Sequence, residues 1–408
     1  MTLTLVPPSP VLPAPVRPDP LGVLGVPGEI NLDHAASAPC ARAAADAVAG
    51  LLPWYASVHR GAGALSRRCT LAYERARQTV GDFLGARPDD HVIFTRNTTD
   101  ALNLLARALP AGTTVITFGG EHHANLLPWP RGSVRLPVPD SPAGAVRSLA
   151  AALGELARDA RPGLPVLVAV TGAGNVTGEC WPVAELARVA HRHGARILVD
   201  AAQLAPHAPV DLAALDVDYV ALSGHKLYAP FGAGVLAGRA DWLDAAPPYL
   251  AGGGATSHVG AATHEVRWTT GPARHEAGTP NLLGAVALAA VCAALGEADR
   301  QALHVREQAL LTRLRRGLAP LPDVVELRTF GPDAPRVGIV SFVVAGRDST
   351  EVAAHLASRH RIGVRDGLFC AHPLTRRLLA EAAARTGRTD LPPTALRASL
   401  GLGTTEPE

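Results

Sequence analysis

The chain has 408 residues, of which 48% are hydrophobic and 4% aromatic, and its formal net charge is +2. This length and composition indicate a globular protein large enough for two domains, with cores built mainly from Ala, Val and Leu. The near-neutral charge and the lack of long basic runs argue against binding to nucleic acid or to a membrane surface.

The first twenty residues contain seven prolines and no charged segment ahead of an apolar stretch. This pattern predicts a disordered or extended leader over residues 1–28 and not a signal peptide. No uninterrupted apolar run reaches about 18 residues, so the sequence predicts no transmembrane helix. We therefore expect a soluble, cytoplasmic protein.

Strand-like and helix-like segments then alternate from about residue 30 to residue 240. The expected strands cover about 92–95, 114–118, 166–170 and 196–200, and the expected helices cover about 100–109 and 183–193. Continuous β-branched runs joined by helices are typical of a mainly parallel sheet covered on both faces. The sequence therefore predicts a large α/β domain over residues 29–283, which contains an irregular glycine-rich segment at about 252–278.

One long helical pattern follows, over about residues 282–318. Beyond it, the pattern changes to strands near 324–330, 337–345, 362–365 and 396–400, with a helix near 350–360. This arrangement predicts a smaller α+β domain over residues 284–408.

The chain contains a single lysine, Lys226, and every other basic side chain apart from histidine is arginine. A primary amine can lose its proton and form a Schiff base, whereas a guanidinium stays protonated and is a poor nucleophile. Lys226 follows an apolar strand pattern at 217–221, in a polar turn of the kind where open α/β sheets place their chemistry. A surface lysine left by compositional drift is the alternative, but the position favours a lysine that binds pyridoxal phosphate.

Such a site needs a partner for the ring nitrogen and a phosphate cradle. Asp200 ends a predicted strand and can pair with a protonated ring nitrogen, although it can equally be a helix cap or a salt-bridge partner. Gln203 lies three residues further on and can reach the ring hydroxyl. Residues 96–100 (Arg-Asn-Thr-Thr-Asp) follow a strand and open a helix, which suits a phosphate, although ordinary capping gives the same pattern. Ser223 and His225 can add donors.

The histidine pair at His122 and His123 follows another predicted strand. A histidine there can stack on the cofactor ring and transfer protons near neutral pH. Metal binding is disfavoured, because adjacent side chains point oppositely on a strand and no third ligand motif is present. The five cysteines form no CxxC or CxxH pair, so neither a zinc site nor a disulfide framework is expected.

Taken together and in order, these motifs resemble the group II cysteine desulfurases of the SufS type, within the class V aminotransferase fold family. The matching segments are 31–36, 58–61, 94–99, 121–125, 175–178, 199–203, 223–228, 276–281 and 397–399. The resemblance implies the α/β fold of fold-type I enzymes that use pyridoxal phosphate, with a large domain and a smaller α+β C-terminal domain. It also implies a homodimer.

Residue by residue, the resemblance implies that Lys226 holds pyridoxal phosphate, Asp200 pairs with its ring nitrogen and His122 stacks on the ring. Gln203 would contact the ring hydroxyl. The phosphate would be bound by Thr98, Thr99, Ser223 and His225, with Thr279 arriving from the partner subunit. The substrate would be contacted by Arg397 and Asn175 at its carboxylate, by Arg365, and by His59 and Arg60 across the dimer interface.

Cys370 matches the position of the family's sulfur-accepting cysteine, although a lone cysteine is more often a small buried hydrophobe. The chain departs from the family pattern at two places, both of which we expect near the entrance of the site. Leu368 and Phe369 replace two histidines, and residues 62–63 are Ala-Gly where Ile-His is common. The family pattern also leads us to expect a final helix after residue 399, and the sequence ends at Glu408 before it.

The sequence thus predicts a cysteine desulfurase that uses pyridoxal phosphate, takes sulfur from L-cysteine as a persulfide on Cys370 and releases L-alanine. Lys226 would move the α-proton, His122 the thiol proton, and a sulfur-acceptor protein would follow. The alternatives are a selenocysteine or carbon–sulfur lyase, a class V aminotransferase of a biosynthetic pathway, or a non-catalytic homologue that serves as a binding partner.

Overall fold

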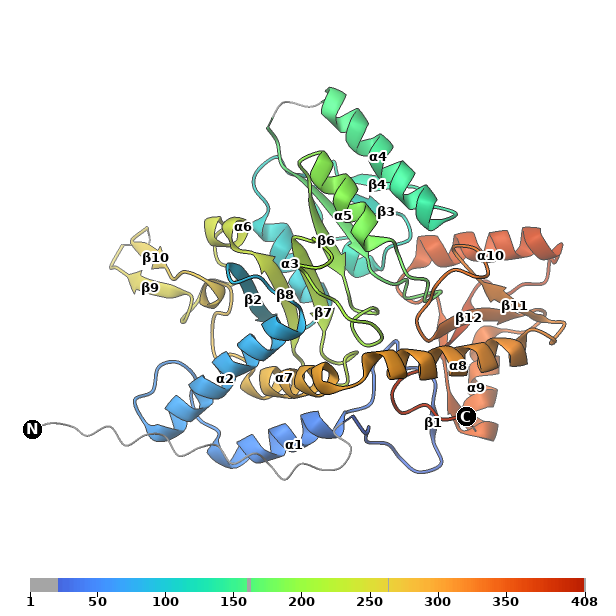
Figure 1. The fold of residues 1–408 in the computed structure, drawn as a ribbon, viewed down its shortest axis with the longest axis horizontal. Helices are drawn as coiled ribbons and strands as arrows, with labels where there is room; N and C mark the ends of the chain where they lie inside the picture. Colours follow the sequence, from blue (N-terminus) through green and yellow to red (C-terminus); the bar gives the residue numbers. More distant parts are fainter. Residues whose placement is uncertain (1–20, 160–162, 263, 407–408) are drawn as a thin grey trace, which may run out of the picture.

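The computed structural model describes residues 21–159, 163–262 and 264–406 (Figure 1). Residues 1–20, most of the predicted proline-rich leader, lie outside the described residues. A seven-stranded sheet in the order β2-β8-β7-β6-β5-β3-β4 lies at the centre of the molecule. Its strands are β2 (Asp90–Thr95), β3 (Thr114–Phe118), β4 (Val134–Leu136), β5 (Val166–Thr171), β6 (Arg196–Asp200), β7 (Tyr219–Ser223) and β8 (Gly234–Arg239).

The sheet is mainly parallel, as predicted. Strands β4, β3, β5, β6 and β7 run parallel to one another, whereas β8 is antiparallel to both β7 and β2. Along β5, Val168 and Val170 enter one core, while Leu167 and Ala169 enter the core on the opposite face. Because both faces are buried, the strands are continuous apolar runs and not alternating ones.

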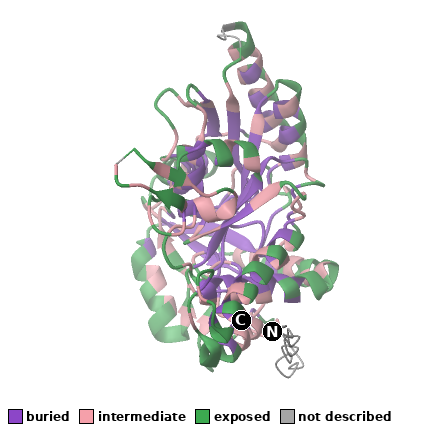
Figure 2. Ribbon diagram, turned by 90° about the vertical axis from the view of Figure 1, so that its left-hand side faces the viewer, coloured by how far each residue is buried: buried purple, intermediate pink, exposed green. Residues whose placement is uncertain are grey.

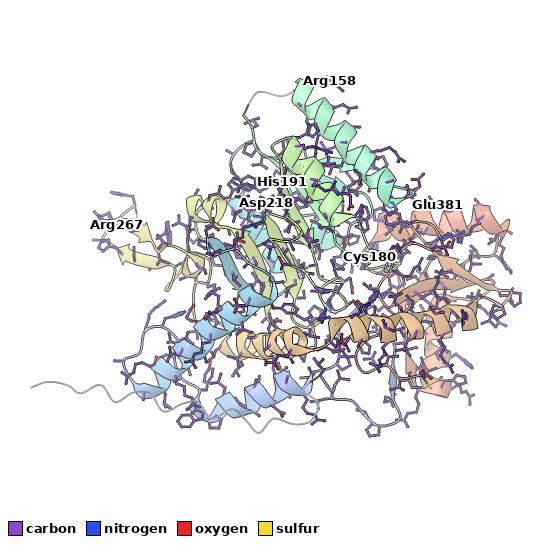
Figure 3. The ribbon with its side chains drawn as sticks, viewed as in Figure 1. Arg158, Cys180, His191, Asp218, Arg267 and Glu381 are labelled. Atoms are coloured by element: carbon purple, nitrogen blue, oxygen red, sulfur yellow. The ribbon has the colours of Figure 1, made fainter. Side chains whose placement is uncertain are left out.

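Helices cover both faces of this sheet, and Figure 2 shows the buried residues concentrated between them. One core takes residues from α1 (Arg42–Leu51), α2 (Ala64–Phe83), α4 (Pro142–Asp159), α5 (Val183–Arg192) and α7 (Leu282–Glu297). The other takes residues from α3 (Thr98–Ala108) and α6 (Ala240–Ala245). On α5, His191 Nε2 lies 2.8 Å from the buried carboxylate of Asp218 (Figure 3), which also accepts from the Ile197 N–H at 2.9 Å. These contacts join the helix to the sheet.

The C-terminal part forms a separate antiparallel sheet in the order β11-β12-β15-β14. Its strands are β11 (Val324–Leu327), β12 (Ile339–Val344), β14 (Arg365–Gly367) and β15 (Ala395–Ser399), and its helices are α8 (Arg300–Leu318), α9 (Ser349–His360) and α10 (His372–Thr386). Near the N-terminus, β1 (Ile30–Asn31) pairs in parallel with β13 (Ile362–Gly363). The segment that contains β1 thus contacts the C-terminal part. The domain boundary near residue 284 stays a prediction.

The prediction of a single long helix over residues 282–318 is wrong. The structure has two helices, α7 and α8, which meet at an angle of 92°. Asp299 causes the second helix to start anew, because its side chain accepts from the Ala302 N–H at 2.9 Å as an N-cap. Among the described helices, none is long and apolar enough by itself to cross a membrane, and only α7 and α8 taken together meet that criterion.

The glycine-rich segment contains a short antiparallel hairpin that projects from the molecule (Figure 1), formed by β9 (Thr256–Val259) and β10 (Val266–Trp268). Three short 3₁₀ helices complete the described elements: η1 (Leu52–Trp54), η2 (His123–Asn125) and η3 (Pro272–Arg274).

Candidate active site

A cavity of about 410 Å³ opens at the carboxyl ends of the central strands, the edge where open parallel sheets hold their ligands. Thr171, Asp200 and Ser223 are the last residues of β5, β6 and β7, and all three line the cavity. It is also lined by the predicted residues Thr98, Thr99, His122, Asn175, Gln203, His225, Lys226, Arg365, Cys370 and Arg397. The structure therefore brings together side chains that lie up to 299 positions apart, from Thr98 to Arg397.

Lys226 and Asp200 form the charged floor of this cavity. Burial lowers the pKa of the Lys226 amine to about 8, opposed by the attraction of Asp200, while Arg397 lowers it further. Burial also raises the pKa of Asp200, which the Ala202 N–H and Lys226 counteract. One Asp200 oxygen accepts from Ala202 N–H at 3.0 Å, and the carboxylate makes no salt bridge within the described part of the chain. It can therefore pair with a cation in the cavity.

The N-terminus of α3 forms a second polar wall. Asn97 caps the helix by accepting from the Asp100 N–H at 3.0 Å. The Thr98 hydroxyl lies 2.7 Å from the Ser223 hydroxyl, which also accepts from Thr98 N–H at 2.8 Å. A helix N-terminus and two hydroxyls suit an anion such as phosphate. Gly234 permits this packing, because a Cβ there would lie 2.5 Å from the Asn97 Cα.

His122 borders the cavity as a neutral ring. Burial lowers its pKa to about 3, and the nearby Lys226, His123 and Arg397 lower it further. Its Nδ1 accepts from the Ala124 N–H at 3.0 Å, so the single ring proton resides on Nε2. The ring can therefore donate from Nε2 without carrying charge.

Arg397 on β15 provides a buried cation in the cavity lining, and only 4% of its surface is exposed. Its Nη1 donates to the Asn175 carbonyl at 3.0 Å and its Nη2 donates to Asp33 Oδ1 at 3.1 Å. Its Nε is buried and has no partner among the described residues. A carboxylate is the natural ligand for such a guanidinium. Arg365 lies 3.8 Å from the same Asp33, so this aspartate serves both arginines.

Cys370 lies in the loop between β14 and α10. Of the five cysteines, all of which fall within the described residues, it is the only exposed one. By contrast, burial raises the pKa of Cys180 to about 11. The Cys370 carbonyl accepts from the His123 N–H at 2.8 Å, which holds the loop beside the histidine pair. An exposed thiol at the mouth of a charged cavity is placed to react with a ligand inside it.

Three predicted residues, His59, Arg60 and Thr279, do not line this cavity. His59 instead bonds Glu74, with Nε2 2.7 Å from Oε1. Arg60 packs against Gly254, where a Cβ would lie 2.4 Å from its Nη2. The neighbouring Gly253 carbonyl accepts from the Gly278 N–H at 2.7 Å, so Arg60 and the Thr279 loop meet at the glycine-rich segment.

Two contributors were not singled out from the sequence. Asp33 lies within the matched segment 31–36, so a signal for it existed, but its pairing with Arg397 spans 364 positions. Glu121 is buried between the Thr171 N–H at 3.1 Å and the Asn125 amide at 2.9 Å. Burial raises its pKa to about 8, those two donors lower it, and Asp200 raises it further. No cluster of three or more potential metal ligands occurs among the described residues.

Comparison with known proteins identifies the family of this chain. Residues 30–408 match the family described as aminotransferase class-V. The chain belongs to this class-V aminotransferase family. It is 38% identical over 359 residues to a cysteine desulfurase of Dickeya dadantii, covering 85% of this chain and 84% of that protein. It is 36% identical over 369 residues to a cysteine desulfurase of Klebsiella pneumoniae, covering 87% of each.

Two solved structures are similar over nearly the whole chain. The apo cysteine desulfurase of Thermococcus onnurineus NA1 has a TM-score of 0.79 and 32% identity, covering 93% of this chain and 91% of that one. The Escherichia coli cysteine desulfurase CsdA, in an S-sulfonic acid form, has a TM-score of 0.75 and 31% identity, covering 93% and 92%. These matches and the mainly parallel sheet confirm the predicted α/β fold of fold type I.

Proposed function

We propose that this protein is a cysteine desulfurase that uses pyridoxal phosphate, takes sulfur from L-cysteine and releases L-alanine. The observation that carries the proposal is the exposed Cys370 at the mouth of a cavity that also holds Lys226, Asp200 and Arg397. The cysteine desulfurases of Dickeya, Klebsiella and Escherichia support it, because they match most of the chain.

The residues in the cavity fit pyridoxal phosphate. The α3 N-terminus with Thr98, Thr99, Ser223 and His225 would hold the phosphate. Asp200 has no salt-bridge partner in the part of the chain that the structure describes, and a pyridinium would supply one. Gln203 would lie near the ring hydroxyl, held by its donation to the Ala35 carbonyl at 2.8 Å. When bound, this cofactor supplies an electron sink for bonds that break at the substrate's α-carbon.

The side chains of this chain would position the substrate and move its protons. Arg397, whose buried Nε has no partner among the described residues, would bind the substrate carboxylate, with Asn175 and Arg365 beside it. The Lys226 amine, whose pKa is lowered to about 8, would take and return the α-proton near neutral pH. His122 would donate a hydrogen bond from Nε2 toward the substrate thiol.

The sulfur transfer would be completed on Cys370. Its thiolate attacks the sulfur of L-cysteine, so that an S–S bond forms while the bond between that sulfur and the substrate's β-carbon breaks. The β-carbon gains a proton, and the products are L-alanine and a Cys370 persulfide, which conserves every atom and electron of L-cysteine and the thiol. A sulfur-acceptor protein would then remove the outer sulfur.

The finer assignments belong to the same proposal. We place the chain in the SufS-type group II, in the cytoplasm, and in a homodimer in which Thr279, His59 and Arg60 reach the partner's cavity. Their position outside the cavity of their own chain supports this assembly. We also retain the division into a large domain ending at residue 283 and a small domain beginning at residue 284.

The test is alanine release from L-cysteine by protein loaded with pyridoxal phosphate, as wild type, Cys370→Ala and Cys40→Ala. Cys40 is half-buried and lies outside the cavity, so it controls for loss of a thiol. Alanine that disappears only in Cys370→Ala supports the proposal. No alanine from wild type, or equal yields in both variants, would overturn it, and pyruvate with ammonia would identify a lyase instead.

A further inference from the structure

The residue before Cys370 has an unusual position in the site. Phe369 lies where the SufS-type group, which the sequence resembles, has a histidine, and only 8% of its surface is exposed. Its ring packs into a cluster that includes Val176 and Leu374. It is thus a core residue placed next to an exposed thiol.

The loop around it adopts a backbone conformation that needs support. Phe369 and Cys370 both have φ of 52°, in the left-handed region that residues with a Cβ rarely adopt. Such a conformation persists only where surrounding contacts hold it. Two successive residues of this kind imply that the loop is fixed by specific partners.

Phe369 supplies those partners through both its backbone and its ring. Its carbonyl accepts from Asn175 Nδ2 at 2.7 Å. Its ring centroid lies 5.2 Å from the guanidinium carbon of Arg397, within the range of a cation–π contact. Arg397 in turn donates to the Asn175 carbonyl at 3.0 Å. Asn175, Phe369 and Arg397 therefore form a closed unit in which each contacts the other two.

This unit joins two tasks of the proposed reaction. Arg397 and Asn175 are the residues proposed to bind the substrate carboxylate, and Cys370 is the proposed nucleophile. We infer that Phe369 is a positioning residue that fixes the Cys370 loop against the carboxylate-binding arginine, through its ring on Arg397 and its carbonyl on Asn175. The inference rests on the proposed function for its catalytic consequence, but its structural part can be measured independently.

The experiment is hydrogen exchange, followed by mass spectrometry, on the full-length chain purified with pyridoxal phosphate. The reporters are the amides of Ala371, which donates to the Leu368 carbonyl, and of His123, which donates to the Cys370 carbonyl. Phe369→Leu removes the ring, and Phe369→Tyr retains it. Phe342→Leu makes the same change at a residue that is 7% exposed in a different core cluster, and it controls for general destabilisation.

We expect Phe369→Leu to speed exchange of these two amides about ten-fold, with Phe369→Tyr near wild type and Phe342→Leu without effect there. Alanine formation should show kcat lowered about ten-fold by Phe369→Leu, because the nucleophile is misplaced. KM should change far less, because Arg397 keeps its bonds to Asn175 and Asp33.

Two results would overturn the inference. One is unchanged exchange in Phe369→Leu, and the other is an equal increase at the same amides in Phe342→Leu. If the wild-type protein makes no alanine, the proposed function is wrong. The exchange data would still decide whether Phe369 fixes the loop.

Discussion

The charge on Lys226 should make the cofactor-free protein less stable at neutral pH. The pKa of its amine falls from 10.5 to about 8 on burial in the folded chain. Each unit of difference corresponds to about 1.4 kcal/mol, so at pH 7 this shift opposes folding by about 3 kcal/mol. Lys226→Met removes the amine with little change in length, so this variant should be more stable than wild type by about that amount at pH 7.

The difference should disappear as the pH rises. Between about pH 8 and pH 10.5 the unfolded chain binds the lysine proton and the folded chain does not. The stability of wild type therefore increases with pH across this window, whereas Lys226→Met lacks the contribution.

The assay is urea unfolding of both cofactor-free proteins, followed by circular dichroism, at steps from pH 7 to pH 10.5. We expect the advantage of Lys226→Met to fall steadily to near zero. An advantage that is constant with pH, or a wild type that is the more stable protein at pH 7, would refute a depressed lysine pKa. Either result would also contradict the proposal that the cavity lowers the pKa of this amine and so makes it reactive.

Two further substitutions test how the site is supported. Glu276 accepts from Arg77 Nη1 at 2.7 Å, and Glu276→Gln should lower the free energy of unfolding by about 2 kcal/mol in urea, since it removes the buried one of the two carboxylates that pair with Arg77 and leaves only the more exposed Glu74. A loss below about 0.5 kcal/mol would equate it with an exposed pair. Gly234→Ala should weaken pyridoxal phosphate binding about ten-fold in equilibrium dialysis, because the added Cβ displaces Asn97 at the phosphate cradle. Gly296→Ala has open space around its Cβ and should bind normally, and equal affinities for both variants would contradict the reasoning.

Five of the seven central strands, β2, β3, β5, β6 and β7, were predictable because each is a short run of mostly apolar residues, whereas β4 and β8 were not predicted. The expected segments 114–118 and 196–200 coincide with β3 and β6. The expected helix over 282–318 failed for a local reason. Hydrophobic periodicity continues through residue 299, whereas the capping bond of Asp299 that redirects the chain depends on one side-chain oxygen.

The cavity was predictable to the extent that its residues end parallel strands. Asp200 and Ser223 follow apolar runs, and the carboxyl ends of parallel strands share one edge of the sheet. The connection of Arg397 to Asp33, and of Phe369 to Asn175, was not predictable in this way. These pairs join segments 364 and 194 positions apart. Asp33 reaches Arg397 because it bridges Ser399 at the end of β15, and Asn175 reaches Phe369 because the segments that follow β5 and β14 meet.

The ionisable groups of the cavity influence one another's pKa. Burial is the main cause of the lowered pKa of His122, and Lys226 and Arg397, two of the cations that would meet the substrate, lower it further, so the ring remains neutral and keeps its Nε2 proton. Glu121 lies close enough to Asp200 for the two carboxyl groups to repel each other. Burial, and then this repulsion, raise the pKa of Glu121 to about 8, so it is largely protonated at neutral pH. Asp200, where Lys226 and the Ala202 N–H oppose the rise in pKa that burial causes, is therefore the carboxyl group placed to pair with a cation in the cavity, because the buried neighbour that would compete with it holds its proton.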